Sequence, residues 1–556
     1  MIRRFPSYVC VLLWLLAACG GSRCDANQPH TAPVASPDKP SAAKPLAAIK
    51  LPRADLRLVL LTDPLGYLEP CGCQKRPLGG LDKLATVLAE ARAGGVPTLL
   101  LSAGDFSVGT ELRPDDAKEA EAQELMREQT FIQIWRGLAP AAIAPGALDL
   151  AQSGTLLEKL SADSGFPWLV DNARAPEKKR SPLAQARIVE IAGRKVGLLG
   201  LVGVDVAHPA SAGLTLADDL ATLAADKSRE LQAQGAELVV ALVSADRRSA
   251  RAIAGRGPDV VLMGGLHVEE PLPPALAGSA VLLHAGQQGQ YAVTLDLGLE
   301  HADAGSSEWE DASDWTRREV RKDLERQISE RIERIEAWAK DPKVDRAELA
   351  AQRERLRELE RERDEPKVPS FAGRWLSAQL VALAPEIAGD RAVSSVIDAH
   401  DQRVNEHNRV SLAGRLPLPA APGTASYAGS ESCAGCHKQA YEWWQGTKHG
   451  HAYATLEAVH KEFNLSCVGC HVVGYNQPGG STVTHVEKLK NVGCESCHGP
   501  GSLHNAQPKA PGLIAEAVPS TVCGGCHTHE HSARFEYDSF RQLLIVPGHG
   551  KPSDRQ

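Results

Sequence analysis

Cys433-Ala434-Gly435-Cys436-His437 is the first of four Cys-x-x-Cys-His sequences in the last quarter of this 556-residue chain. The others are Cys467-Val468-Gly469-Cys470-His471, Cys494-Glu495-Ser496-Cys497-His498 and Cys523-Gly524-Gly525-Cys526-His527. Two thiols at this spacing form thioethers to one porphyrin, and the adjacent histidine then binds the iron as the proximal ligand. Zinc sites also use Cys-x-x-Cys pairs, but four copies that are each followed by histidine favour haem. The sequence therefore predicts four covalently bound haem c groups.

The second axial ligand of each iron separates an electron carrier from an enzyme, because an iron with an open position can bind a substrate. Eight histidines of this region lie outside the motifs: His449, His451, His460, His485, His504, His529, His531 and His549. They suffice for two histidines at every haem. Four porphyrins leave residues 425–556 little room for a side-chain core, so we expect mostly irregular chain with short helices there.

Three of these histidines lie in distinctive local sequences: Trp444-Gln-Gly-Thr-Lys-His449-Gly-His451, Gly499-Pro-Gly-Ser-Leu-His504 and Pro547-Gly-His549-Gly550. Together with the haem spacing, they make residues 426–551 resemble the multihaem cytochrome c-554 family. The resemblance implies that His449, His504 and His549 are distal ligands, and that one haem can lack a sixth protein ligand. His451 is an alternative to His449, since one residue separates the two.

The chain begins with Met1-Ile-Arg-Arg4, an apolar run and Leu16-Ala17-Ala18-Cys19. A basic start, a short apolar segment and small residues before a cut indicate an export signal over residues 1–19. Leu-Ala-Ala-Cys resembles the lipobox of bacterial lipoproteins, which implies lipidation of Cys19 and, with Gly20, an outer-membrane position facing the periplasm. A plain signal peptide is the alternative. Residues 20–54, rich in Pro, Ala, Ser and Lys, indicate a flexible tether.

Short apolar runs alternate with helical patterns over residues 55–303. Strands are predicted at 56–61, 98–102, 196–202, 237–243, 260–263 and 280–284, and a helix at 81–93. Gly193-Arg194 predicts a hairpin turn. The alternation indicates an α/β domain with helices outside a sheet.

The predicted strand ends resemble the metallophosphoesterase domain of the 5'-nucleotidase family. The matches are Thr62-Asp63 with Gly66, Leu78-Gly-Gly-Leu81, Ser102-Ala-Gly-Asp105, Met263-Gly-Gly-Leu-His267 and Ala285-Gly286. The resemblance implies an α/β sandwich, but two bridged cations need several Asp, His and Asn ligands. Of these, Asp63, Asp105 and His267 survive. We therefore expect a degenerate site without a divalent metal, in a domain kept for binding or scaffolding. Nucleotide hydrolysis is the alternative.

Cys71-Gly72-Cys73 and Cys24 belong to neither the haem motifs nor the signal. The Cys-Gly-Cys sequence resembles a subset of these domains with redox-type cysteines. A strained disulfide, a metal site with His267, a redox pair and a simple structural disulfide are all open. Cys24 is either free or paired with another chain.

Charged residues dominate from Trp309 to Asp364. Apolar residues recur there at steps of three and four, which predicts a helix: Trp315, Val320, Leu324, Ile328, Ile332, Ile335 and Trp338. Lys340-Asp-Pro-Lys343 interrupts this helix, and residues 346–363 predict a second. Within residues 304–415 we therefore expect a helical hairpin, which projects from the body or pairs two subunits, and a further helix near 375–383.

A net charge of −8 gives no concentrated basic face, which excludes a nucleic-acid binder. The predicted function is electron transfer outside the cytoplasm, with redox proteins as partners and a lipid anchor at the membrane. One rival is an oxidoreductase with an open haem that acts on a small nitrogen or sulfur compound. The other is phosphoesterase activity of the α/β domain.

Overall fold

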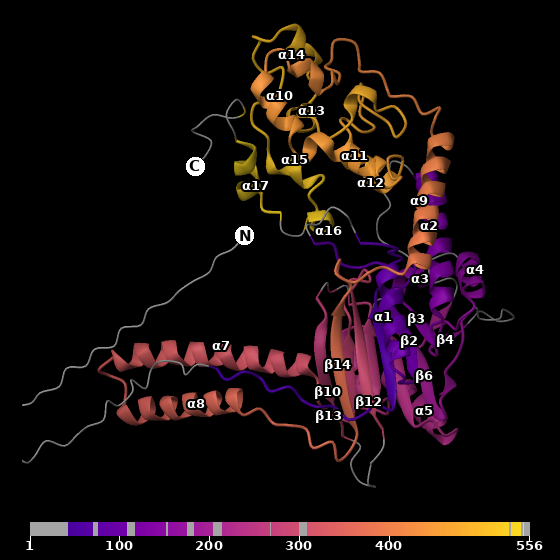
Figure 1. Cartoon of the computed structure of the whole chain (residues 1–556), viewed down its shortest axis with the longest axis vertical. Coiled ribbons are helices and arrows are strands. Elements are labelled where there is room, and N and C mark those ends of the chain that lie inside the picture. Colours follow the sequence, from indigo (N-terminus) through magenta and orange to yellow (C-terminus); the bar gives the residue numbers. More distant parts are fainter. Residues whose placement is uncertain are drawn as a thin grey trace, which may run out of the picture. The chain divides into compact units, whose positions relative to one another are not determined.

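The computed structural model describes residues 43–70, 76–107, 117–151, 154–174, 183–203, 214–266, 268, 270–299, 308–532, 535–545 and 549. Contacts between residues divide the chain into two units (Figure 1). One unit contains residues 323–365 together with the described residues 43–45. The other contains residues 46–322 and 366–556.

The larger unit contains two six-stranded sheets, ordered β13-β14-β12-β1-β2-β3 and β10-β11-β9-β8-β6-β5. The strands of the first sheet are β1 (Leu56–Thr62), β2 (Thr98–Gly104), β3 (Ala142–Pro145), β12 (Tyr291–Gly298), β13 (Glu310–Asp311) and β14 (Trp375–Ala382). Those of the second are β5 (Arg187–Ile191), β6 (Arg194–Val202), β8 (Leu238–Ser244), β9 (Val260–Gly264), β10 (Leu272–Ala277) and β11 (Ala280–His284). A two-stranded sheet pairs β4 (Ala173–Arg174) with β7 (Thr215–Leu216).

The two large sheets pack face to face, and helices cover their outer faces. Leu58 and Leu60 of the first sheet share a core with Val240 and Leu262 of the second. The outer helices are α1 (Leu81–Ala93), α2 (Ala117–Leu138), α4 (Gly154–Ser164), α5 (Leu220–Ala233), α6 (Arg247–Ala254) and α9 (Arg391–Ser411), with the short α3 (Ala147–Leu150) at the end of β3. Burial on both faces explains why β2 and β8 are continuous apolar runs. The predicted α/β sandwich is confirmed.

The predicted hairpin forms between β5 and β6, which pair antiparallel up to Ile191 opposite Arg194. Its two turn residues, Ala192 and Gly193, have φ values of 50° and 81°. Positive φ at both positions belongs to the type I′ turn, whose twist matches that of the flanking strands.

The helix predicted near residues 375–383 is wrong, because this segment is strand β14. All eight residues of β14 pair antiparallel with β12, from Tyr291 opposite Ala382 to Gly298 opposite Trp375. Trp375, Leu376 and Ala378 are buried against the sandwich. Pairing with a strand about 80 residues earlier in the chain overrides the local pattern. The first sheet thus extends beyond residue 303.

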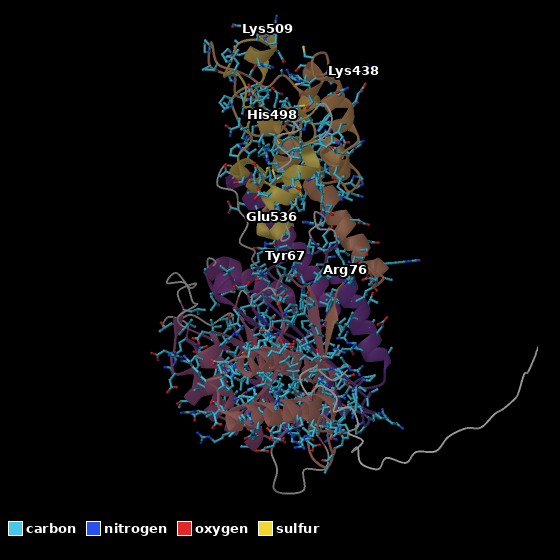
Figure 2. All side chains as sticks on the ribbon, turned by 90° about the vertical axis from the view of Figure 1, so that its left-hand side faces the viewer. Tyr67, Arg76, Lys438, His498, Lys509 and Glu536 are labelled. Carbon is cyan, nitrogen blue, oxygen red and sulfur yellow. The ribbon has the colours of Figure 1, made fainter. Side chains whose placement is uncertain are left out.

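The C-terminal region consists of short helices joined by irregular chain, as expected. Its helices are α10 (Lys438–Gln445), α11 (Ala452–Glu457), α12 (Leu465–His471), α13 (Cys494–His498), α14 (Ser502–Ala506), α15 (Ser520–Gly524), α16 (His529–Ser532) and α17 (Tyr537–Leu544), with 3-10 turns at Ser430–Cys433, His449–His451 and Glu487–Leu489. A small apolar cluster includes Tyr453, Leu465 and Val468. Figure 2 labels His498 within this region. Among the described residues, no helix is long and apolar enough to span a membrane.

The predicted helical hairpin is also present. Helix α7 (Asp314–Ala339) ends before Lys340, and α8 (Arg346–Asp364) begins where the Asp345 side chain accepts a hydrogen bond from the amide of Ala347. Ile328 and Ile335 of α7 pack against Leu356 and Leu359 of α8. This small cluster is the apolar contact that joins the two helices.

Replacing Ile335 with Ala should loosen the hairpin. Ile335 is fully buried, and deletion of a buried aliphatic side chain costs about 2–5 kcal/mol. Hydrogen exchange over residues 323–365 should then become faster, while exchange of β1 and β8 stays unchanged. Val320→Ala, at a position 54% exposed on the same helix, is the control. Equal exchange in both variants would show that the cluster does not stabilise the hairpin.

Candidate functional site

The four Cys-x-x-Cys-His motifs each form a short helical turn. In the first and last motifs, the amide of the histidine donates to the carbonyl of the first cysteine, over 2.9 Å from His437 to Cys433 and 2.8 Å from His527 to Cys523. The second and third motifs lie in α12 and α13. None of the eight cysteines forms a disulfide in the structure. The turns therefore bring each histidine close to its own cysteine pair, as haem attachment requires.

Three proximal histidines face a second histidine. The ring centroids are 6.3 Å apart for His437 and His504, 6.3 Å for His527 and His449, and 6.0 Å for His498 and His549. A histidine nitrogen lies about 2 Å from a bound metal, and the ring centre lies about 1 Å beyond it, so two rings on opposite sides of one metal have centres about 6 Å apart. The three pairs thus fit two-histidine ligation of a haem iron, with the distal candidates His449, His504 and His549.

Hydrogen bonds orient several of these rings. Nδ1 of His471 lies 2.6 Å from the carbonyl of Ala452, and Nδ1 of His498 lies 2.7 Å from that of Ala515. Nδ1 of His549 lies 2.7 Å from the carbonyl of Leu544, and its ring stacks on Trp443. A bond at Nδ1 leaves Nε2 as the nitrogen that binds iron, and it fixes the ring.

His451 is the alternative that the sequence left open beside His449. The His451 ring is exposed, and its Nδ1 lies 3.0 Å from the carbonyl of Thr447. The His449 ring instead lies against His527, and burial followed by the charge of His527 lowers the pKa of His449. The structure therefore favours His449, and the assignment of both remains a prediction.

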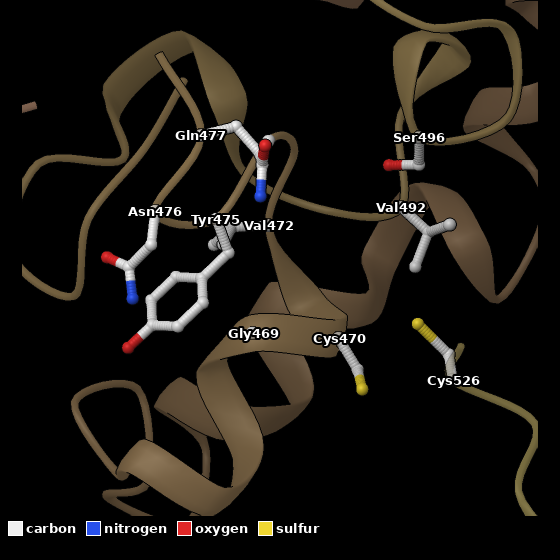
Figure 3. A pocket seen from close by; sticks show the side chains of 10 residues that line it. Gly469, Cys470, Val472, Tyr475, Asn476, Gln477, Val492, Ser496 and Cys526 are labelled. Carbon is white, nitrogen blue, oxygen red and sulfur yellow. The ribbon is translucent and has the colours of Figure 1, made fainter. Parts of the chain in front are cut away.

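His471 differs from the other proximal histidines. None of the three histidine pairs found among the described side chains includes His471. A cavity of about 330 Å³ lies beside its motif and is lined by Cys470, Tyr475, Asn476, Gln477 and Val492, among others. Figure 3 shows the Cys470 and Cys526 thiols on one side of this cavity, with the Asn476 and Gln477 amides on the other. Because the thiols of Cys470 and Cys526 line this cavity, it is space that bound haem would fill.

Glu495, between the cysteines of the third motif, joins three segments of the region. Its buried carboxylate accepts hydrogen bonds from the amides of Ala428 at 2.8 Å, Gly429 at 2.7 Å and Gly501 at 2.7 Å. The first two residues lead to the first motif, and Gly501 leads to His504. Bonds from amides to a carboxylate are stronger than those between neutral groups. Glu495 therefore helps to place His504 opposite His437.

The strand ends of the α/β part bring Asp63 and Asp105 together, but backbone amides bind their carboxylates. Asp63 Oδ1 accepts from the amides of Asp105 at 2.9 Å and Gly265 at 2.8 Å, while Asp105 Oδ1 accepts from that of Leu148 at 2.7 Å. Within the described ranges, no group of three or more His, Cys, Asp or Glu side chains could hold a metal ion. Cys19, Cys24, Cys71, Cys73 and His267 lie outside the described residues.

Asp149 and His284 complete this buried cluster, and the sequence analysis did not single them out. Asp149 accepts from the amides of Phe106, Ser107 and Gly146, and burial followed by the charge of Asp105 raises its pKa to about 6. Nε2 of His284 lies 3.9 Å from Asp63. The only sequence feature that pointed to His284 was its position as a polar residue at the end of the apolar strand β11. These contacts connect the loops after β1, β2 and β3.

Comparison with known proteins assigns the C-terminal region. Residues 432–499 match the family model described as cytochrome c554 and c-prime. We refer to residues 425–556, the C-terminal region that contains this match, as the cytochrome c554 region. A cytochrome c-554 of Nitrosomonas europaea is 39% identical over 108 residues, which are 16% of this chain and 46% of that protein. The chain thus spans about half the length of this curated relative. The match indicates covalently bound haem c and electron-transfer chemistry in the matched residues.

Distant structural likenesses involve more of the chain. A 5'-nucleotidase precursor from Thermus thermophilus has a TM-score of 0.42 at 16% identity, over 67% of this chain and 61% of its own. The sulfate thiohydrolase SoxB of the same species has a TM-score of 0.42 at 15% identity, over 79% and 74%. The calcineurin-like phosphoesterase YfkN of Bacillus subtilis has a TM-score of 0.42 at 13% identity, over 64% and 99%. Likenesses of this strength assign no activity to the α/β part.

Replacing His449, His504 or His549 with Ala should each convert one low-spin haem to high spin, because one axial ligand is removed. Electron paramagnetic resonance of the oxidised protein measures the change. His451→Ala is the matched control and should leave the spectrum unaltered. A high-spin signal from His451→Ala and none from His449→Ala would reverse the assignment at that haem.

His284 should make the free energy of unfolding depend on pH. Burial, followed by the charge of Arg247, lowers the pKa of His284 to about 4, against about 6.5 in the unfolded chain. Below pH 6.5 the unfolded chain therefore binds a proton that the folded chain does not, so stability falls as the pH drops toward 4. Gln cannot take up this proton. From pH 7 to pH 5, the stability of wild type relative to His284→Gln should thus fall by about 2 kcal/mol.

Denaturant unfolding followed by circular dichroism at the two pH values measures this difference. The buried carboxylates titrate alike in both proteins and cancel in the comparison. A constant difference would mean that His284 takes up its proton equally well in the folded and unfolded chains.

Proposed function

We propose that this protein is an exported, tetrahaem c-type cytochrome that transfers electrons outside the cytoplasm. The observation that carries the proposal is the set of three histidine pairs whose ring centroids lie 6.0–6.3 Å apart. The family match over residues 432–499 supports the same chemistry. Lipidation of Cys19, an outer-membrane position facing the periplasm and redox proteins as partners belong to the proposal.

The chain's own residues have separate tasks in this function. The cysteine pairs hold each haem in place, and the bound haem supplies one-electron chemistry at its iron. The three histidine pairs would hold the irons of three of the four haems and would exclude water and other ligands from them. Such sites have no place for a substrate, which suits electron transfer.

The first test is the haem content of the full-length protein matured in a cytochrome c-producing host. We expect four haems per chain by the pyridine haemochromogen assay, and mostly low-spin signals in electron paramagnetic resonance. Replacing both cysteines of one motif with Ala should remove one haem. Labelling with radioactive palmitate should depend on Cys19, with Cys19→Ser as the control. Fewer than four haems in the wild type would refute the tetrahaem proposal.

A second candidate function rests on the different surroundings of His471. Its lack of a paired histidine among the described side chains favours one open haem. We propose, as the alternative, an oxidoreductase that acts there on a small nitrogen or sulfur compound. A high-spin signal approaching one haem in four would support it. Complete absence of a high-spin signal would leave electron transfer as the only function proposed for the haems.

For the α/β part we propose a scaffolding role. The carboxylates of Asp63, Asp105 and Asp149 accept backbone amides, whereas a two-metal phosphoesterase needs such groups as ligands. Arg127 reinforces the same loops through the carbonyls of Gly66 and Ser107. Phosphate release by the full-length protein with added Mn²⁺ would contradict this role.

A further inference from the structure

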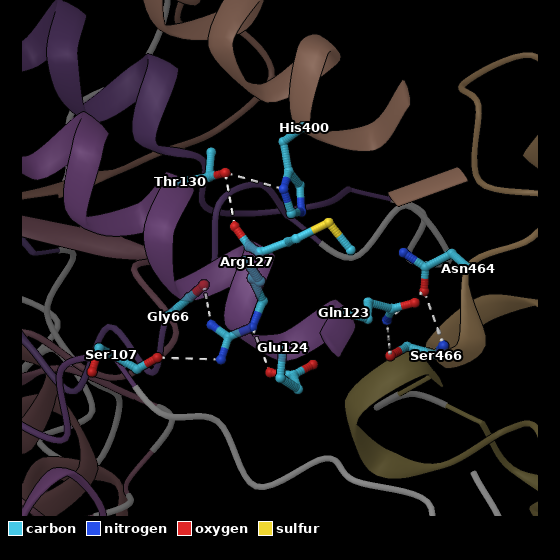
Figure 4. Close-up of polar contacts among 10 residues, drawn as sticks. Gly66, Ser107, Gln123, Glu124, Arg127, Thr130, His400, Asn464 and Ser466 are labelled. Atoms are coloured by element: carbon cyan, nitrogen blue, oxygen red, sulfur yellow. Dashed lines mark hydrogen bonds and ion pairs between the residues drawn. The ribbon is translucent and has the colours of Figure 1, made fainter. Parts of the chain in front are cut away.

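Gln123 of α2 lies at the contact between the α/β part and the cytochrome c554 region. Its side-chain amide is buried and forms four hydrogen bonds. The oxygen accepts from the side chain of Asn408 at 2.9 Å and from the amide of Leu465 at 3.0 Å. The nitrogen donates to Asn464 at 3.2 Å and to Ser466 at 3.4 Å (Figure 4). Three of these four partners form the start of α12.

Other residues of the α/β part hold the same segment. Asn408 of α9 also donates to the carbonyl of Phe463 at 2.9 Å, and the amide of Phe463 donates to Asn405 at 2.9 Å. Just upstream, Lys461 pairs with Glu69 at 2.8 Å and Asp401 at 3.4 Å. The single ammonium of Lys461 thus lies between two carboxylates, and burial raises the pKa of one of them, Asp401, to about 7. The segment leading into α12 is therefore fixed from α2, α9 and the loop after β1.

Helix α12 carries the second haem motif. It runs from Leu465 to His471 and contains both Cys467 and Cys470. Leu465 and Val468 pack with Ala120 of α2, and the other end is fixed by the bond between His471 Nδ1 and Ala452. Because a helix of seven residues is short and stiff, the position of its first turn determines the position of its histidine.

We propose that Gln123 is a positioning residue for the haem of the Cys467–His471 motif, so that the α/β part supplies part of the framework of that site. The inference rests on the proposed haem function and concerns the second motif alone. Within the described residues, the hydrogen bonds of Gln123 reach α9 and the start of α12 and none of the other three motifs. The α/β part thus acts on the one motif whose histidine has no partner ring among the described side chains.

Gln123→Met tests this inference in the full-length, haem-loaded protein. Met matches Gln in length but cannot form the four hydrogen bonds. Hydrogen exchange over residues 465–471 should become about tenfold faster, while exchange over residues 494–498 stays unchanged. One of the four midpoint potentials should shift by about 59 mV, a tenfold change in that haem's reduction equilibrium, because outer-shell contacts tune a metal site. Gln232→Met, at an exposed position of α5, is the control.

Gln123→Glu retains the acceptor for Leu465 and Asn408 but replaces the donor to Asn464 with a second oxygen, so exchange over residues 465–471 should lie between that of wild type and that of Gln123→Met. Faster exchange of α12 with four unchanged potentials would overturn the inference, because Gln123 would then be merely structural. Equal shifts of all four potentials would overturn it as well. A wild-type protein with fewer than four haems would refute the proposed function itself, which separates the two failures.

Discussion

Two imidazole rings on opposite sides of one metal must be held about 6 Å apart. The cytochrome c554 region has few buried apolar side chains to hold them, since its cluster around Tyr453 and Val468 is small. Directed hydrogen bonds therefore take a large share of the task. Glu495 joins the segments that carry His437 and His504, and the carbonyl of Leu544 orients His549. The ligand geometry depends on individual polar contacts more than on a continuous core.

In the α/β part, apolar packing contributes more than individual polar contacts. Its two sheets share an extensive apolar core, and helices cover both outer faces. Buried carboxylates at its strand ends bind backbone amides of neighbouring loops, and those of Asp63 and Asp149 each accept more than one. The same positions that resemble a metal site therefore serve to connect loops. A domain fixed in this way is well suited to hold another part of the chain.

Features that depend on neighbouring residues were predictable from the sequence. The haem motifs, helix α1, the turn before β6 and the helical hairpin all follow from spacing or from turn chemistry over a few residues. Strand β14 was missed because its conformation depends on β12, far away in the chain. The pairing of His527 with His449 likewise joins residues 78 positions apart, and only the family resemblance named His449. Nothing in the local sequence of His284 or Asp149 revealed their cluster.

Gln123 illustrates the same limit, and it bears on why the two parts occur in one chain. A glutamine inside a charged helix gives no signal in the sequence, yet its amide is saturated by groups from α9 and α12. If the two parts were separated, the groups at this contact would exchange their hydrogen bonds across it for hydrogen bonds to water. The second motif thus takes part of its support from outside the cytochrome c554 region. His471 of this motif also lacks a partner ring among the described side chains. The hydrogen bonds from the α/β part therefore support the motif whose histidine has no second histidine to fix its position.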